Sequence, residues 1–561
     1  MIFMTEPDSY AVRGRALECL GHIAVAIGPQ HFSRYFEMGM QSANQGMQLG
    51  DLALKEYSYV FIANCVKVMG RAFDPLLIQL VPYLLEVVSE NELTLVNEED
   101  ESDNEDENDE DDDPDSGNYR VNVNDGFVNS KKAAVTAIGI LAEHTKEAFF
   151  PFLEDAINAI LVDGVGALSS LHHIVRAEAV SILPHFVGVA CAKYGPLEHP
   201  KKGHIVGLND IVSQVVKVSL GAFISVMEHD ADKEPVAMAC EGIIGVLDHV
   251  GMAALITQDD NGTHFAQTIM AAVKTLLSEK AKCQTASKFE GADDDDDDDH
   301  DNIVMDSVSD LIGALAKNIG AEFEPYFSAF HPLLLKFTKA TRPYSDRAMA
   351  IGCYAEVFAE IGPKAALYAD TLLPILEVSL KDSMEGVRRN AAFCLGVLVE
   401  ATGTYLSSHI MQMLSWLYPL CSMRESQPTN DMGGADIDNA ISSVARMINT
   451  LQTLIPLDQV LPVMLSALPL RSDHSEGENV YGCIARLMLS GETNALNLLP
   501  KILESFAVVL HPDSKATAET KTLVKSSLVQ MMNSPQGQET LRSALSNLPA
   551  ETAQMIENMI R

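Results

Sequence analysis

One amphipathic segment recurs along this chain, and its recurrence constrains the fold more than any other feature. Residues 384–403, MEGVRRNAAFCLGVLVEATG, place apolar side chains at three- and four-residue steps, which gathers them on one face of a helix. The same residue types recur at the same offsets as VRGRALECLG over residues 12–21, and as VRAEAVSIL over residues 175–183. One such helix cannot bury its apolar face alone, so the sequence predicts a stack of similar units.

A second marker gives the length of the unit. Glycines followed by Pro or an aromatic residue lie 42, 42 and 41 residues apart within the pairs Gly28–Gly70, Gly320–Gly362 and Gly362–Gly403. A period of about 40 residues with two helices is that of HEAT or armadillo repeats. Prolines in the first helix of the pairs favour HEAT repeats, because Pro kinks a helix; these are Pro75, Pro82, Pro325, Pro332 and Pro374.

We therefore predict an all-α solenoid of HEAT repeats, with two antiparallel helices per repeat, as a single domain over residues 1–561. The chain opens directly on a second-helix pattern at residues 9–28, with no preceding partner helix. Natural solenoids begin with a polar capping repeat. We therefore expect this chain to be the C-terminal part of a longer one.

The charge balance limits the partners. The chain carries 78 acidic and 39 basic residues, a net charge of −39, which repels nucleic acid and anionic membranes and attracts basic proteins. None of the nine cysteines forms a CxxC pair, so we expect reduced thiols in a cytosolic or nuclear protein. We see no unbroken apolar run of about 18 residues, and we therefore expect no membrane span.

Two segments hold much of this negative charge. Residues 98–115 include 14 acidic residues and residues 290–301 include nine, and neither segment has a Lys or an Arg. Like charges without apolar residues cannot form a core, so we predict disordered acidic insertions over residues 91–127 and 287–301. They either attract a basic partner or only keep the chain soluble. The acidic residues proposed for the first role are Glu98, Glu99, Asp100, Asp111, Asp112, Asp113, Asp294, Asp295, Asp296 and Asp297.

The sequence shows no catalytic signature. GxxxxGK[ST], GxSxG and HExxH motifs are all missing, and the pair His172-His173 is better explained as a helix start than as a metal site. We therefore expect no enzyme activity, no metal site and no cofactor.

Polar and aromatic residues recur on the predicted second helices, which line the concave face of such solenoids. Glu356, Phe393, Asn439 and Glu476 are spaced by 37, 46 and 37 residues, close to one repeat. An amide can hold a peptide backbone, carboxylates can pair with Lys or Arg, and an aromatic ring can cover a cationic side chain. The alternative is an ordinary solvated helix face. The neighbours in this predicted site are Glu360, Asn390, Glu400 and Glu478.

Together with the stretches YAVRGRALECLGHIAVAIG (residues 10–28) and DIDNAISS (residues 436–443), these features resemble the karyopherin-β, or importin-β, family. The similarity is greatest to its importin-4 and importin-5 type carriers of histones and ribosomal proteins. It implies a monomeric receptor that shuttles between cytoplasm and nucleus and carries basic cargo through nuclear pores. The lysine-binding role that it implies is carried onto Glu356, Phe393, Asn439, Glu476 and Glu478.

The resemblance also implies two further partners. Ran GTPase would bind mainly through an N-terminal half that this sequence lacks, and phenylalanine-glycine nucleoporins would bind between first helices. The alternative function is a HEAT-repeat scaffold or histone chaperone without a transport role.

Overall fold

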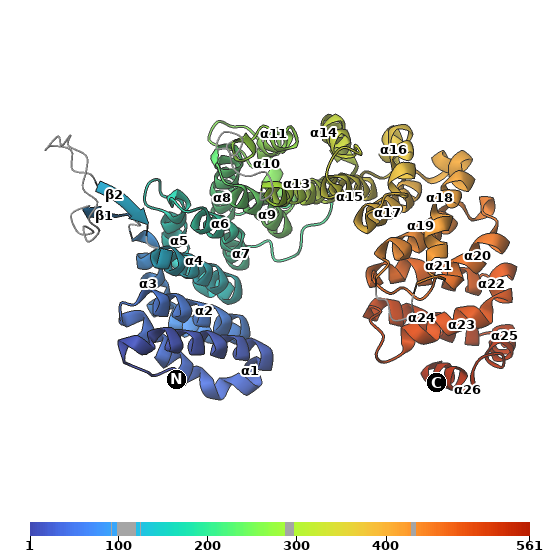
Figure 1. Ribbon diagram of the computed structural model, residues 1–561, viewed down its shortest axis with the longest axis horizontal. Helices are drawn as coiled ribbons and strands as arrows, with labels where there is room; N and C mark the ends of the chain where they lie inside the picture. Colours follow the sequence, from blue (N-terminus) through green and yellow to red (C-terminus); the bar gives the residue numbers. More distant parts are fainter. Residues whose placement is uncertain (91–92, 98–118, 124, 286–296, 428–432, 561) are drawn as a thin grey trace, which may run out of the picture. The chain divides into compact units, whose positions relative to one another are not determined.

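The computed structural model describes residues 1–561 apart from 91–92, 98–118, 124, 286–296, 428–432 and 561 (Figure 1). The described chain consists of helical pairs and one small hairpin, which confirms the predicted α-solenoid. It divides into two compact units, Met1–Ala314 and Leu315–Arg561. The single domain over residues 1–561 stays a prediction.

Unit 1 begins with α1 (Tyr10–Gln48), in which Gly28 is not helical and separates two helices. The following helices are α2 (Leu52–Met69), α3 (Leu77–Ser89), α4 (Asp125–Thr145), α5 (Leu153–Leu161), α6 (His173–Ser181) and α7 (Leu183–Tyr194). The rest of the unit is built by α8 (Asp210–His229), α9 (Lys233–Val250), α10 (Met252–Ile256), α11 (Phe265–Leu277), α12 (Lys282–Thr285) and most of α13 (Asp297–Ile319).

Unit 2 repeats the pairing more regularly. Its first five helices are α14 (Glu324–Phe337), α15 (Tyr344–Ile361), α16 (Ala366–Ser379), α17 (Glu385–Thr402) and α18 (Ile410–Met423). They are followed by α19 (Ala435–Leu451), α20 (Leu457–Ser466), α21 (Gly477–Leu489), α22 (Thr493–Asn497), α23 (Leu499–Leu510), α24 (Ala518–Met532), α25 (Pro535–Leu545) and α26 (Ala550–Ile560).

The second helices of unit 2 form one continuous row. Helix α15 contacts α17, α17 contacts α19, α19 contacts α21, and α21 contacts α24. The first helices α18 and α20 lie on the other side of this row (Figure 1). Apolar side chains fill the space between the helices, as the predicted stripe requires: Val387, Ala391 and Leu395 of α17 are fully buried.

The glycine and proline markers have the local roles that the sequence predicts. Gly362 and Gly403 end α15 and α17 with φ angles of 58° and 59°. Residues other than glycine rarely adopt such backbone angles. Pro82, Pro332 and Pro374 lie inside the first helices α3, α14 and α16. The repeat boundaries are therefore set where the sequence places them.

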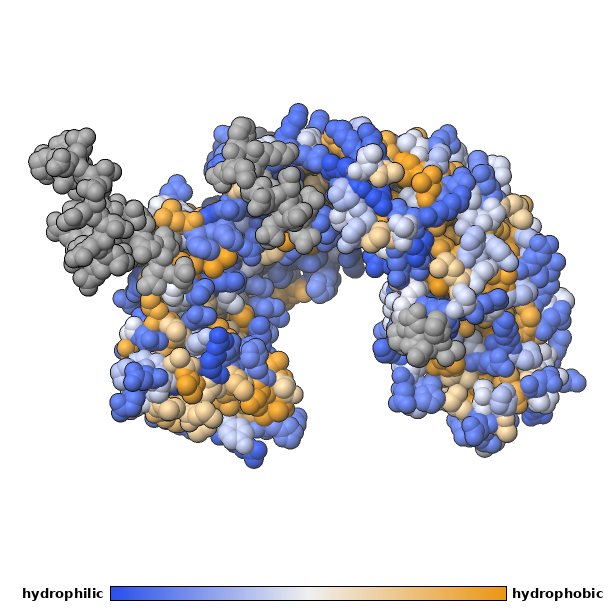
Figure 2. All heavy atoms as spheres, in the orientation of Figure 1, coloured by the Kyte–Doolittle hydropathy of each residue, from blue (hydrophilic) through white to orange (hydrophobic). Residues whose placement is uncertain are grey.

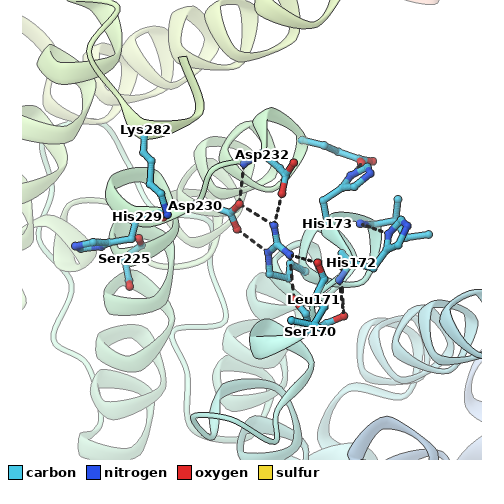
Figure 3. Close-up of polar contacts among 12 residues, drawn as sticks. Ser170, Leu171, His172, His173, Ser225, His229, Asp230, Asp232 and Lys282 are labelled. Atoms are coloured by element: carbon cyan, nitrogen blue, oxygen red, sulfur yellow. Dashed lines mark hydrogen bonds and ion pairs between the residues drawn. The ribbon is translucent and has the colours of Figure 1, made fainter. Parts of the chain in front are cut away.

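The arginine of the recurring motif joins consecutive repeats. The Arg176 guanidinium donates to both oxygens of Asp230, at 2.8 and 2.9 Å, and to the carbonyl oxygens of Ser170 and Leu171. Figure 3 shows Asp230 and Asp232 facing Ser170 and Leu171 across this contact. His172 caps α6 by accepting from the Ile174 amide, which agrees with its predicted place at a helix start.

Unit 2 contains the same contact. Arg388 donates to Asp436 at 2.7 Å and to the carbonyl oxygens of Asp382 and Ser383, and Arg347 donates to both oxygens of Asp382. We call Arg176, Arg347 and Arg388 the ladder arginines. Each ties the start of a second helix to a carboxylate of the next repeat.

The insertion boundaries need correction. Strands β1 (Leu93–Asn97) and β2 (Tyr119–Val123) pair antiparallel inside the range predicted to be disordered, and α4 begins at Asp125. Alternating apolar residues in both segments favour this pairing. Similarly, α13 begins at Asp297, inside the second range predicted to be disordered. Acidic residues 98–100, 111–113 and 294–296 lie outside the described residues.

The thiols and the apolar helices complete the description. Eight of the nine free cysteines are buried, and Cys19 is exposed. By length and hydropathy alone, four described segments could cross a membrane, namely Leu52–Ser89, His173–Tyr194, Asp210–His229 and Glu385–Met423. This finding corrects the expectation of no membrane span. Within the units they use their apolar residues for helix packing, while polar residues cover much of the visible surface (Figure 2).

Candidate cargo-binding surface

The eight predicted contact residues all lie in unit 2, and Glu400 is on α17. Glu356 and Glu360 are on α15, Asn390 and Phe393 on α17, and Asn439 on α19. Glu476 ends a short 3-10 turn before α21, and Glu478 is in the first turn of α21. Because these helices contact one another in this order, the residues follow one row of second helices.

The structure brings three predicted residues together around an arginine that the prediction missed. Arg446 of α19 donates from Nη2 to Glu476 Oε2 at 3.0 Å and from Nη1 to Glu400 Oε2. Its guanidinium carbon lies 5.4 Å from the centre of the Phe393 ring. We call Phe393, Glu400, Arg446 and Glu476 the Arg446 cluster. It joins three consecutive repeats.

Neighbouring polar groups hold Glu476 in place. The Ser442 hydroxyl donates to Glu476 Oε2, and the Asn479 amide donates to Ser442 Oγ at 2.7 Å. Only 11% of the Glu476 side chain is exposed, against 55% for Glu400. The cluster therefore has one fixed carboxylate and one that reaches solvent.

The two predicted asparagines are used inside the fold. Asn439 is buried and donates to the Ala435 carbonyl and to Asp473, each at 2.9 Å. Asn390 donates to the Ala348 carbonyl at 2.7 Å. The expected contact between Asn439 and a peptide backbone is therefore not available here, because burial removes its amide from the surface.

A buried carboxylate positions the loop that carries Glu476. Asp438 Oδ2 accepts three backbone N–H bonds, from Arg471, Ser472 and Asp473, at 2.7 to 3.0 Å. Its other oxygen accepts from Arg424, and both side chains are almost fully buried. Burial raises the pKa of Asp438, while the three N–H donors and Arg424 oppose that rise. Asp438 thus fixes the chain just before the cluster.

The carboxylates at either end of the row reach solvent. Glu356 and Glu478 are exposed, and Glu360 is half-buried. Among the described residues, no group of three His, Cys, Asp or Glu side chains could hold a metal ion. The row is therefore suited to hold cationic side chains through carboxylates and an aromatic ring.

This combination of helical-repeat fold and carboxylate-lined second helices is that of a protein-binding solenoid, and comparison with known proteins defines it further. A model of the family described as importin subunit beta-1-like, TPR repeats, matches residues 296–443. The chain is 26% identical over 523 residues to the probable importin subunit beta-4 of Schizosaccharomyces pombe, covering 90% of this chain and 47% of the relative. It is 25% identical over 441 residues to human importin-4, covering 78% of this chain and 38% of the relative.

Solved structures agree with the fold. The karyopherin Kap121p bound to the SUMO protease Ulp1p superposes with a TM-score of 0.67 at 14% identity, over 98% of this chain and 48% of that one. Kap121p bound to RanGTP gives 0.64 at 13% identity, over 98% and 49%. The chain is similar to proteins of the importin-β family, and it spans about half the length of the relatives it matches.

Sequence reasoning missed Arg446 and the ladder arginines for different reasons. The ladder arginines recur in the sequence, but their carboxylate partners lie at or just before the start of the next second helix, in segments whose sequences differ from one repeat to the next. Arg446 is absent from the predicted site because that prediction pairs the carboxylates with a cation of the bound peptide and not with one of the chain itself. The sequence does contain a signal for this pairing, because Arg446 lies on the second helix between those that carry or follow Glu400 and Glu476.

Proposed function

We propose that this chain is the cargo-binding part of a nuclear import receptor, and that it holds basic segments of proteins such as histones or ribosomal proteins along the second helices of unit 2. One observation carries this proposal. The Arg446 guanidinium lies over the Phe393 ring and between Glu400 and Glu476, so the surface already accommodates a cationic side chain.

The relatives support the same direction. Kap121p has been seen bound to RanGTP, to Ste12p and to Pho4p. For the full-length receptor we propose binding of Ran GTPase and shuttling between cytoplasm and nucleus. The acidic segments 98–115 and 290–301 would steer a basic cargo by long-range attraction, and deletion of residues 98–115 should slow association and reduce its salt dependence.

A peptide-binding experiment tests the cargo proposal. A fluorescent histone-tail peptide should bind the chain in a salt-sensitive way, and the same peptide with acetylated lysines should bind weakly, because acetylation removes the charge. Equal affinity for the two peptides would contradict the proposed recognition of cations.

A groove on the other side of unit 2 supports a second partner. It lies between the first helices α18 and α20, has a volume of about 250 Å³, and is lined mainly by apolar side chains, including Met411, Leu414, Tyr418, Val460 and Val463. Met411 and Tyr418 are 53% and 58% exposed. We propose that this groove takes the phenylalanine side chain of a phenylalanine-glycine nucleoporin.

This groove distinguishes transport from the alternative of a scaffold or histone chaperone. The chain should bind a phenylalanine-glycine repeat peptide, and Tyr418→Glu should weaken that binding. Tyr405→Glu is the matched control, since Tyr405 is similarly exposed at 53% but does not line the groove. A chain that binds basic peptides but not the repeat peptide would favour the scaffold or chaperone function.

A further inference from the structure

The Arg446 cluster contains a cation that belongs to the chain itself. Arg446 is 17% exposed and contacts Phe393, Glu400 and Glu476 at once. A lysine or arginine from a bound peptide would need the same carboxylates and the same ring face. Both cations cannot hold these groups together, because like charges repel at such distances.

Close helix packing brings Arg446 to this position. A Cβ on Gly396 of α17 would lie 3.1 Å from Arg446 Cδ and 2.4 Å from Ser443 Oγ. The lack of a side chain at Gly396 therefore lets α19 approach α17, and the arginine can reach across to Glu400. Its position follows from the backbone and not only from the attraction of charges.

Arg446 is bound by contacts that can be exchanged. Glu400 is 55% exposed, and the buried Arg446 Nε atom makes no hydrogen bond within the described structure. The ladder arginines differ, because each donates to backbone carbonyls as well as to a carboxylate. Within the described part of the chain the Arg446 guanidinium donates only to the carboxylates of Glu400 and Glu476, so a competing cation can replace all that holds it.

We propose that Arg446 is an internal competitor of the cargo, a specificity-determining residue that occupies the carboxylate and aromatic groups until a basic segment displaces it. This inference rests on the proposed cargo function. A tethered guanidinium has a high effective concentration at its own site. A single lysine cannot replace it efficiently, whereas a segment with several basic residues can also contact exposed acids such as Glu356 and Glu478. The receptor thereby rejects weakly basic peptides.

The test compares two arginines of the same face. Arg446→Gln frees Glu400 and Glu476 and should tighten binding of a fluorescent lysine-rich peptide by roughly three- to ten-fold, the range expected when a partly exposed ion pair is released. Arg486→Gln is the matched control, since Arg486 of α21 also carries one positive charge but bonds only the neutral acceptors Asn449 and Gln452. It should change affinity by less than about two-fold.

A second pair of variants identifies the competing groups. Glu476→Gln should change the affinity of the otherwise unaltered chain little, because it removes a group that both cations use. In the Arg446→Gln background the same change should abolish most of the gain in affinity. Thermal unfolding of each variant, together with Arg446→Lys, which keeps the charge but not the bridging geometry, checks that the fold is retained.

The outcomes separate this inference from the proposed function. If the unaltered chain binds the peptide and Arg446→Gln does not bind it more tightly than Arg486→Gln does, the competitor role is wrong and cargo binding stands. If neither the chain nor Arg446→Gln binds the peptide, both proposals fail. Binding by Arg446→Gln alone would support the competitor role and contradict cargo binding by the unaltered chain.

Discussion

The ladder arginines of unit 2 and Arg446 differ in what their guanidinium groups contact. The ladder arginine Arg388 lies between consecutive repeats and contacts two backbone carbonyls and the buried Asp436. Arg446 lies on the second-helix face and contacts only side chains, one of them the exposed Glu400. An arginine fixed by backbone oxygens stabilises the repeat, whereas one held by side chains on the surface remains exchangeable.

The largest expected effect tests the structural side of this comparison. Arg388→Ala leaves the carboxylate of Asp436, which is 2% exposed, without its cation, and should lower the free energy of unfolding by about 3 kcal/mol. Urea unfolding measures this loss. Arg389→Ala, at the exposed neighbouring position, is the control, and Arg446→Gln should cost less than about 1 kcal/mol. Equal losses for Arg388→Ala and Arg446→Gln would remove the distinction.

Asp438→Asn tests whether Asp438 holds the loop of residues 471–473, which precedes Glu476 of the Arg446 cluster. The amide oxygen can still face the three N–H donors, but the NH₂ group then faces Arg424, which loses its charged acceptor. We expect a loss of about 2 kcal/mol in unfolding free energy and faster hydrogen exchange of the amides at residues 471–473. Asp458→Asn, at an exposed carboxylate of α20, should change neither quantity. Unchanged exchange in Asp438→Asn would show that other contacts hold this loop.

A charge reversal tests the exchangeable side. Glu478→Lys should weaken binding of a lysine-rich peptide by roughly five- to ten-fold and leave thermal stability unchanged, because Glu478 is exposed at the start of α21. Fluorescence anisotropy at low and moderate salt gives the affinity. Glu504→Lys reverses an equally exposed charge on the first helix α23 and should have a smaller effect. Equal losses for both variants would assign the effect to net charge and not to the row of second helices.

The smallest effect concerns two half-buried histidines of unit 1. Burial lowers the pKa of both His185 and His249, so the folded state favours neutral imidazoles. Their contribution to stability is present above the unfolded pKa of about 6.5 and is lost as pH falls from there through the lowered folded pKa. The melting temperature should therefore decrease as the pH is lowered below about 6.5. His249→Gln should make the melting temperature depend less steeply on pH. An unchanged slope would show that other groups dominate the acid response.

The sequence predicted the repeat architecture because its markers act locally. Gly362 and Gly403 end second helices, and the apolar stripe of residues 384–403 is buried as its spacing requires. The hairpin of β1 and β2 was missed, since the dense charge between the strands hid two short alternating segments.

The site was predicted only in part. Spacing by one repeat brought Phe393 and Glu476 into the same prediction, and the structure joins them through Arg446. Spacing could not show that Asn439 turns inward to Asp473, because the direction of a side chain near the edge of a helical face depends on how the next helix packs. The contact roles of Glu356, Glu360 and Glu478 stay predictions.

The close approach of α17 and α19 at Gly396 has a consequence for the proposed binding of basic peptides. The distance between adjacent second helices sets the interval at which successive carboxylates are offered, and a methyl group at Gly396 would meet Ser443 Oγ at 2.4 Å and push the helices apart. Gly396 therefore sets the spacing between α17 and α19. Under the proposed function, a wider interval would favour peptides whose basic residues are spaced further apart. The charged groups of the chain would stay the same.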